Sequence, residues 1–391
     1  MSEIKVNSIK GVGASAAAIT VNNTDGTCTA NITNNLSNRN LIINGAMQVA
    51  QRGTSSTTTS YSTVDRFKNN HSGTDEAPTQ AQVDVASGTA PFTNGFRKAF
   101  KVTNGNQTSG AGAGDRLFTQ TKLEARDIAN SGWNYKSSSS FITLSFWVKS
   151  SVSQNFYGYI RSITGSSYYQ VYETGNLTAD TWTKITKTFS GNSNISFENS
   201  TAKGLDVYLP APYWGTDYTA SGTALNTWAS WNGSARQPDS TTTWYTTNDA
   251  TFEITGVQLE VGSVATDFEH RSFAQELLLC QRYYQEIGRS TTMVGNTGSS
   301  QIGNVGVPIA CAMRATPTIA SGITYHMWHG NNDGKNNDGT AMTINSFSTS
   351  TYPQHSPMMS GTVTGFSGNT DNRVGCVIAN SGTVIKMSAE L

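Results

Sequence analysis

Charged residues are scarce in this sequence. They make up 13% of its 391 residues, against roughly 25% in typical soluble domains. The 26 basic and 26 acidic residues cancel and form no basic run, which argues against a nucleic-acid partner. No stretch approaches the ~18 apolar residues of a membrane-spanning helix, so we expect no membrane insertion. Residues 1–10 alternate polar and apolar side chains and have no apolar signal core.

Cysteine is also sparse, and none of the four cysteines forms a CxxC pair. We therefore expect no metal-binding cluster, no cofactor and no disulfide framework, with Cys311 and Cys376 as the one pairing left open. The patterns GxSxG and HExxH and a phosphate-binding glycine loop are also missing, so we expect no enzyme. A structural calcium ion stays open, without ligands that the sequence identifies.

What the sequence does have is aromatic residues (10%) among abundant serine, threonine, asparagine and glycine. Ile142, Leu144, Phe146 and Val148 share one face of residues 141–149, and this period of two predicts a half-buried strand. The same alternation recurs in residues 182–189, 205–209 and 252–261. Many short strands separated by segments rich in glycine, asparagine, serine and threonine predict a mostly β chain, with an antiparallel jelly-roll β-sandwich over residues 41–271.

The segments that flank this sandwich differ from it. Residues 1–40 have too few large apolar side chains for a core, so we expect an extended attachment arm that a partner orders. Residues 289–391 contain several short strand patterns, and about a hundred residues suffice for a small independent domain. We expect a second, smaller β-sandwich there, at the tip of the molecule.

Residues 272–288 predict a helix between the two domains. Ser272 is a suitable N-cap, Gln275 completes a capping box, and Gly288 is a stop signal. The apolar positions follow a 4, 3, 4, 3 spacing. They are Phe273, Leu277, Cys280, Tyr284 and Ile287. Two interpretations stay open: a helix packed on its own sandwich, and a bundle of such helices around an oligomer axis.

Aromatic side chains in polar loops are candidates for glycan binding, because they stack on the apolar faces of sugars. The first set of candidates is Tyr213, Trp214, Trp231 and Trp244, and the second is Tyr325, Trp328 and Tyr352. The alternative is that members of these sets fill the hydrophobic core.

Several stretches of the sequence match one known family. They are Asn40–Gly53 followed by Asp65-Arg66-Phe67, then Phe146–Ser150, Trp182–Lys184, Phe252–Arg271 and Glu276–Tyr284. Together they resemble a jelly-roll domain of bacteriophage tail-fibre and related virion proteins, over residues 40–286. The domain is common in phages of marine bacteria and cyanobacteria and is often likened to carbohydrate-binding modules. It carries no catalytic motif.

The resemblance implies a homotrimer, because fibres of this type are generally trimeric. The stripe from Phe273 to Ile287 would then form an axial three-helix bundle. Residues 1–38 are similar to the attachment ends of cyanophage fibres. This implies that residues 1–40 bind other phage tail or virion proteins on the tail exterior, and that the chain adsorbs to host-surface polysaccharide. Residues 289–391 resemble nothing we can name, as expected of a variable receptor-binding tip.

Three alternatives remain: a head fibre or connector with a purely structural role, a secreted carbohydrate-binding protein, and a tailspike depolymerase. The missing signal peptide counts against the second. The lack of long parallel-β-helix repeats counts against the third.

Overall fold

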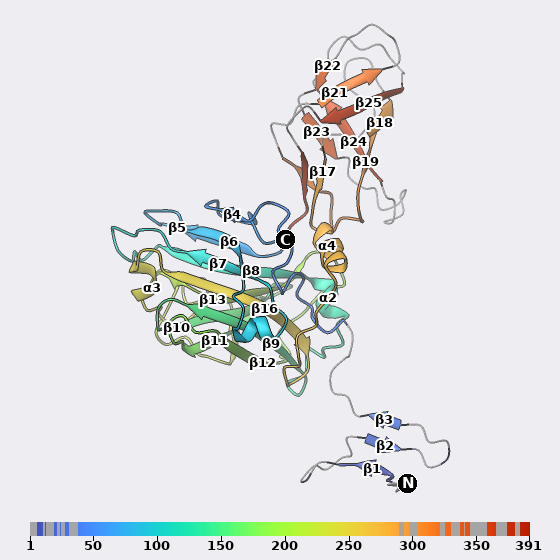
Figure 1. The fold of residues 1–391 in the computed structure, drawn as a ribbon. Coiled ribbons are helices and arrows are strands. Elements are labelled where there is room, and N and C mark those ends of the chain that lie inside the picture. Colours follow the sequence, from blue (N-terminus) through green and yellow to red (C-terminus); the bar gives the residue numbers. More distant parts are fainter. Residues whose placement is uncertain are drawn as a thin grey trace.

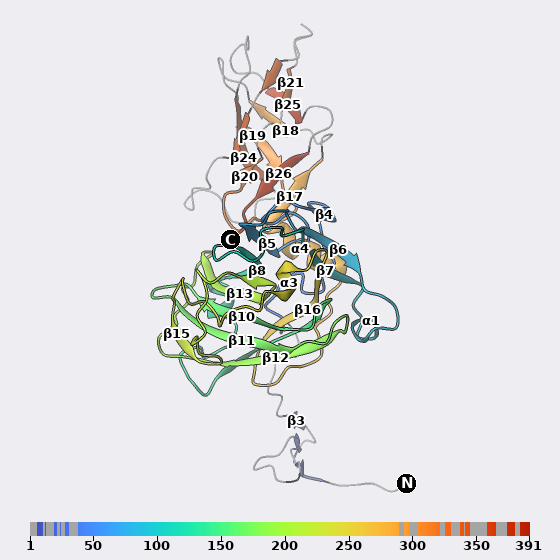
Figure 2. The same cartoon turned by 90° about the vertical axis from the view of Figure 1, so that its left-hand side faces the viewer.

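The computed structural model describes residues 38–288 continuously, residues 304–320 and 384–391, and shorter pieces towards both ends of the chain. These pieces are residues 6–10, 12, 19–21, 24, 28–30, 293–296, 325–329, 337–339, 341–344, 358–364 and 374–379. The described chain is mostly β and forms several antiparallel sheets, which confirms the predicted fold class. A small sheet near the N-terminus and a larger one near the C-terminus lie at opposite ends of a central sandwich (Figure 1, Figure 2).

The sandwich consists of two antiparallel sheets. Sheet I has the order β14-β8-β13-β10-β11-β15, with β5 also beside β8, and sheet II has the order β12-β9-β16-β7-β6-β4. The strands of sheet I are β5 (Lys68–Ser72), β8 (Arg116–Glu124), β10 (Asn155–Ser162), β11 (Tyr168–Asn176), β13 (Lys203–Ala211), β14 (Tyr213–Trp214) and β15 (Trp228–Ser230). Those of sheet II are β4 (Ser55–Ser56), β6 (Thr79–Asp84), β7 (Lys98–Thr103), β9 (Phe141–Ser150), β12 (Thr183–Ser190) and β16 (Thr251–Val261). Three short helices accompany them: α1 (Ala90–Thr93), α2 (Ala125–Ala129) and α3 (Thr243–Thr246).

The hydrophobic core lies between the two sheets. Ile142, Leu144, Phe146 and Val148 of β9 are fully buried there, as their alternation predicts. Leu144 pairs with Leu259 of β16, and both side chains belong to this core. The side chains at the alternate positions of β9 lie on the outer face of sheet II, where Ser145 and Trp147 line the candidate site.

Residues 40–47 close one end of the sandwich through buried polar contacts. The Asn40 side-chain oxygen accepts hydrogen bonds from the backbone N–H groups of Ile42 and Leu259, and its Nδ2 donates to the Val257 carbonyl. A Cβ on Gly45 would lie 2.0 Å from that same carbonyl oxygen, so no side chain fits at this position. This close approach explains the glycine within the Asn40–Gly53 stretch.

The helix after the sandwich is shorter than predicted. Helix α4 (Phe273–Gln281) begins with the expected capping box between Ser272 and Gln275, but it ends at Gln281. Residues Tyr284–Ile287 form strand β17 instead, which pairs with β26 (Ile385–Ser388). The prediction of a helix through Ile287 was therefore wrong, because a distant strand offers these residues a ladder of backbone hydrogen bonds.

The shorter helix also contradicts the predicted axial bundle. Cys280 is buried at the end of α4, and Tyr284 and Ile287 are buried within β17, so the chain itself covers three of the five stripe residues. Leu277 is half-buried, whereas Phe273 is 55% exposed and its neighbour Leu278 is 49% exposed. A continuous apolar stripe along residues 272–288 does not exist, and trimerisation itself stays a prediction.

The region after α4 forms two further sheets. Strands β17, β26 and β20 (Thr318–Ile319) make a three-stranded sheet beside the sandwich, which we call the stalk sheet. A seven-stranded sheet follows, in the order β22-β21-β25-β18-β19-β24-β23. Its strands are β18 (Met293–Asn296), β19 (Asn304–Pro308), β21 (Tyr325–His329), β22 (Asn337–Gly339), β23 (Ala341–Ile344), β24 (Met358–Thr364) and β25 (Val374–Ala379). The N-terminal sheet contains β1 (Ser8–Ile9), β2 (Ile19–Val21) and β3 (Cys28–Ala30).

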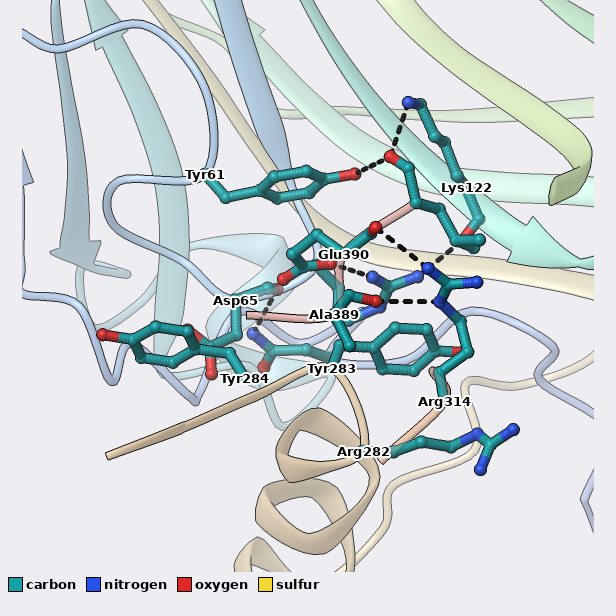
Figure 3. A network of polar contacts seen from close by, with 12 residues as sticks. Tyr61, Asp65, Lys122, Arg282, Tyr283, Tyr284, Arg314, Ala389 and Glu390 are labelled. Atoms are coloured by element: carbon teal, nitrogen blue, oxygen red, sulfur yellow. Dashed lines mark hydrogen bonds and ion pairs between the residues drawn. The ribbon is translucent and has the colours of Figure 1, made fainter. Parts of the chain in front are cut away.

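A buried polar network joins the last residues of the chain to the sandwich (Figure 3). The Arg66 guanidinium donates through Nη1 to the Glu390 carboxylate, and its Nη2 donates to the Lys122 carbonyl at 2.6 Å. The same guanidinium lies 3.4 Å from the centre of the Tyr283 ring. Arg52 adds a second ion pair to Glu390, with an N–O distance of 3.1 Å. The Arg66 charge is thus paired, hydrogen-bonded and stacked, although it is almost completely buried.

A second part of this network holds the end of α4. The Arg282 guanidinium forms a bidentate salt bridge with the Glu124 carboxylate, with both N–O distances at 2.8 Å. The Tyr283 hydroxyl donates to the same carboxylate at 2.7 Å. Arg314 donates to the Ala389 and Thr201 carbonyls, each at 2.8 Å. Residues far apart in the sequence therefore meet in one junction between the sandwich and the stalk sheet.

Replacing Glu390 by alanine should destabilise the protein by about 3–5 kcal/mol, because the change leaves the Arg66 charge buried without its partner. Denaturant unfolding of the variant measures this loss. Asp84→Ala is the matched control, since it breaks an exposed ion pair. The Asp84 side chain is 82% exposed and that of its partner Lys98 is 38% exposed. The control should cost less than about 1 kcal/mol. Equal losses in the two variants would contradict a special role for the buried pair.

Asp65 should make stability depend on pH. Burial raises the pKa of Asp65 from 3.8 to about 6, against the opposing effects of Arg52 and Gln51. The folded chain therefore binds this proton more tightly than the unfolded chain. The stabilisation that comes from this tighter proton binding is fully present below pH ~4 and is lost as the pH rises through about 6. The free energy of unfolding should fall by about 2–3 kcal/mol over this range. Unfolding curves between pH 4 and 7 should show this fall in the wild type, and Asp65→Asn should flatten it; an unchanged slope would refute the assignment.

Candidate functional site

A groove of about 400 Å³ lies on the outer face of sheet II, on the far side from the core. Strands β9, β12 and β16 form its floor, and the segments around residues 93–96 and 266–270 form its walls. The lining residues are Thr93, Asn94, Gly95, Phe96, Ser145, Trp147, Lys184, Gly256, Thr266, Asp267, Phe268 and His270.

Trp147 reaches this groove because of strand parity. Its neighbours Phe146 and Val148 point into the core, so Trp147 points to the outer face, where it is half-buried. Lys184 is its cross-strand partner on β12, and the two side chains therefore share this face. The floor thus presents an aromatic ring next to an exposed ammonium group.

Gly256 makes room for the aromatic wall. It lies where the pairing of β16 with β9 shifts register, and its φ of +65° is in the left-handed region that favours glycine. A Cβ at this position would lie 2.6 Å from the Phe96 ring. The glycine therefore allows Phe96 to pack directly over the strand.

Three rings are packed against each other in the wall. Phe96 and Phe268 meet edge to face, with 4.8 Å between ring centres. The His270 ring lies 5.1 Å from Phe96 and 4.9 Å from Phe268, and its Nε2 donates to the Asn94 carbonyl at 2.9 Å. Phe96 is buried and supports the other two rings, so a ligand would meet the rings of Phe268 and His270 already held in place.

Buried polar groups of β16 hold the loop that carries Asp267 and Phe268. The Glu260 carboxylate accepts hydrogen bonds from the Thr266 backbone N–H at 2.8 Å and from its hydroxyl at 2.6 Å. Gln258 accepts the backbone N–H of Glu269 at 2.8 Å. The groove therefore offers aromatic rings, hydroxyl and amide groups, one ammonium and one carboxylate on a firmly held frame, which suits stacking and hydrogen bonding.

Two of the predicted glycan contacts, Tyr213 and Trp244, lie inside the core. Tyr213 stacks on Tyr245, with 4.3 Å between ring centres, and the Trp244 Nε1 donates to the Thr251 carbonyl at 3.0 Å. Both side chains are buried, so neither presents a ring face to a sugar. These two predictions were wrong, because the loop in which the sequence places them folds back between the sheets.

Trp214 is also buried, but on the outer face of sheet I. It stacks on Phe118 with 4.4 Å between ring centres and contacts Tyr218 in the loop that follows β14. This prediction was wrong because the segment of residues 215–240 covers the ring. Trp231 belongs to the covering segment itself and is half-buried, with the Arg161 guanidinium 4.1 Å from its ring centre. Its role as a glycan contact stays a prediction.

The second set of predicted contacts lies beyond the described side chains. Tyr325 and Trp328 belong to strand β21, whose backbone is described, and Tyr352 lies outside the described residues. Their role therefore stays a prediction. Within the described residues, no group of three or more histidine, cysteine, aspartate or glutamate side chains is placed to hold a metal ion. No helix in the same residues is long and apolar enough to cross a membrane.

Sequence reasoning missed Trp147 and Phe268. Trp147 carried a usable signal, because a tryptophan on the outer parity of an amphipathic strand exposes a large ring to solvent. Phe268 carried none, since its position depends on the contacts of Glu260 and Gln258 with the loop.

Comparisons with known proteins give a limited result: no family model and no curated protein matches the chain. Among solved structures, tailspike protein 4 of bacteriophage CBA120 is similar at 9% identity and a TM-score of 0.30, over 57% of this chain and 21% of the tailspike. A putative sugar binding protein from Bacteroides thetaiotaomicron has 13% identity and a TM-score of 0.32, over 57% of this chain and all of its own. A family 11 carbohydrate-binding module from Clostridium thermocellum has 13% identity and a TM-score of 0.26, over 57% of this chain and all of the module. At these TM-scores, none of the three carries a conclusion about this chain.

Proposed function

We propose that this chain is a virion fibre that binds glycan on the host surface, and that the groove on sheet II is a contact site for the sugar. The observation that carries the glycan proposal is the combination of the half-buried Trp147 with the accessible rings of Phe268 and His270, which pack on the buried Phe96. Sugar rings have apolar CH faces that stack on such surfaces. Ser145, Lys184 and Asp267 line the same groove and supply partners for ring hydroxyls.

The virion part of the proposal is supported by the resemblance of residues 40–286 and by the arrangement of the sheets. The N-terminal sheet and the seven-stranded sheet lie at opposite ends of the sandwich, which suits a molecule that is attached at one end and contacts a target at the other (Figure 1). Residues 1–40 would bind other tail or virion proteins, on the exterior of the tail. Several weak glycan sites on one particle would gain strength through multivalency.

The groove also favours a binding role over a catalytic one. Asp267 is its single carboxylate, whereas glycoside hydrolysis ordinarily uses a pair of carboxyl groups on opposite sides of the bond. We therefore propose that the chain binds polysaccharide without cleaving it.

Trp147→Ala should weaken binding of host polysaccharide about tenfold, because it removes the ring on which a sugar would stack. The variant should retain the unfolding temperature of the wild type to within a few degrees, since the ring is half-buried on an outer face. Binding is measured with purified host polysaccharide on a sensor surface, at equal protein concentrations.

Trp231→Ala is the comparison variant for this experiment, since it removes a half-buried tryptophan, itself a predicted glycan contact, from the opposite face of the sandwich. Loss of binding in this variant alone would move the site to sheet I. Wild-type binding in both variants would refute the groove, and no binding by the wild type would favour the purely structural head fibre or connector. New reducing ends in the polysaccharide would overturn the non-catalytic proposal.

In solution we expect about three times the 41.8 kDa chain mass. Because Phe273 and Leu278 of α4 are large, apolar and about half exposed, they are the side chains we expect a neighbouring copy to cover. Light scattering should show a trimer for the wild type and a smaller species for the double variant Phe273→Asp, Leu278→Asp. A monomeric wild type would contradict the trimer, and a trimeric double variant would exclude this surface.

A further inference from the structure

A second depression, also of about 400 Å³, lies where the sandwich meets the stalk sheet. One wall comes from the segment that contains Arg52, Thr58 and Tyr61, and the other comes from Tyr284, Ile319 and Lys386 of the stalk sheet. We call it the junction pocket. It shares no lining residue with the groove on sheet II, so it is a separate feature of the molecule.

The back of the junction pocket is held by contacts within the chain. The Arg52 guanidinium lies 3.6 Å from the centre of the Tyr284 ring, and its nitrogens lie 3.4 Å from Asp65 and 3.1 Å from Glu390. The Tyr284 hydroxyl donates to Glu286 at 2.6 Å. These side chains are therefore in place before a ligand arrives, and binding would cost little ordering of the wall.

Charge balance in the junction pocket favours an uncharged ligand. Asp65 and Glu390 together balance the charges of Arg52 and the neighbouring Arg66, and the Lys386 ammonium lies 4.0 Å from the Glu286 carboxylate. The pocket therefore carries no large net charge of either sign, so an anionic or cationic ligand would gain little electrostatic attraction there.

The chemistry of the walls indicates a polyhydroxylated ligand. Thr58 and Tyr61 contribute hydroxyl groups, and further hydroxyls come from serine and threonine side chains on both walls. A hydroxyl that donates one hydrogen bond retains lone pairs that accept bonds from ligand hydroxyls. Ile319 and the largely buried Tyr284 line the same pocket and add apolar atoms. This mixture matches the two kinds of surface that an uncharged sugar presents.

We propose that the junction pocket binds a neutral saccharide, and that the bound saccharide holds the stalk sheet against the sandwich. The second part follows from the origin of the walls, because a ligand that contacts both the sandwich segment and the stalk sheet stabilises their mutual position. The proposal does not depend on the sheet II groove, since the two sites have no residue in common.

The test uses the full chain with the Trp147→Ala substitution, which weakens the groove on sheet II, and a pair of tryptophan variants then assigns the remaining binding to the junction pocket. Maltose, lactose and cellobiose are the probes, and glucuronate is the charged comparison, with saturation-transfer NMR as the readout. Thr58→Trp fills the pocket from an exposed position, whereas Thr57→Trp places the same ring on the adjacent exposed residue, which does not line the pocket.

We expect at least one disaccharide to bind the Trp147→Ala protein more tightly than glucuronate does. Thr58→Trp should weaken this binding at least tenfold, and Thr57→Trp should leave it unchanged. Disaccharide should also slow hydrogen exchange at the Ala320 amide, which donates to the Lys386 carbonyl in the stalk sheet. The proposal is overturned if no disaccharide binds, if glucuronate binds best, if the two tryptophan variants bind equally, or if exchange at Ala320 is unchanged by saturating disaccharide.

Discussion

The ion pair between Arg66 and Glu390 is the constraint on which the arrangement of the C-terminal half depends. These residues are 324 positions apart, and both are buried where they meet. Removing two charges from water is costly, and the cost is offset only when the remaining donors and acceptors find partners. Here the Lys122 carbonyl accepts a hydrogen bond from Arg66 Nη2 and the Tyr283 ring covers the guanidinium, although the buried Nε has no hydrogen-bond partner among the described residues. The stalk sheet is therefore attached at a defined position on the sandwich.

The same constraint explains why the helix ends where it does. Tyr283 lies beneath Arg66 and donates to Glu124, and a helix continued through this residue would have to forgo the pairing of Tyr284–Ile287 with β26. The capping box at Ser272 was predictable, because it depends on residues three positions apart. The end of the helix was not, because its partner strand lies about a hundred residues later in the chain. Local spacing therefore predicted where α4 begins. It failed to predict where α4 ends, because tertiary contacts determine that position.

A similar division applies to the candidate site. The alternation in β9 predicted which of its residues form the core, and the same parity places Trp147 outside. By contrast, aromatic residues in a polar segment are compatible with exposure or burial, and only the path of the covering chain decides between them. Trp214 is closed off by the segment that follows it, and Tyr213 is enclosed between the sheets. Composition indicated that aromatic side chains matter here, but it did not identify the accessible rings.

The chain leaves the sandwich through β17 and returns to it through β26, which lies beside β17 in antiparallel register. Figure 2 shows both strands running between the sandwich and the distal sheet. A mechanical load on the distal sheet would pull both strands in the same direction, so their mutual hydrogen bonds would carry little shear. The force would pass instead to the two points where the strands enter the sandwich, at Tyr283 and Glu390. Tension at the far end of the molecule is thus divided between two adjacent anchors of one buried network.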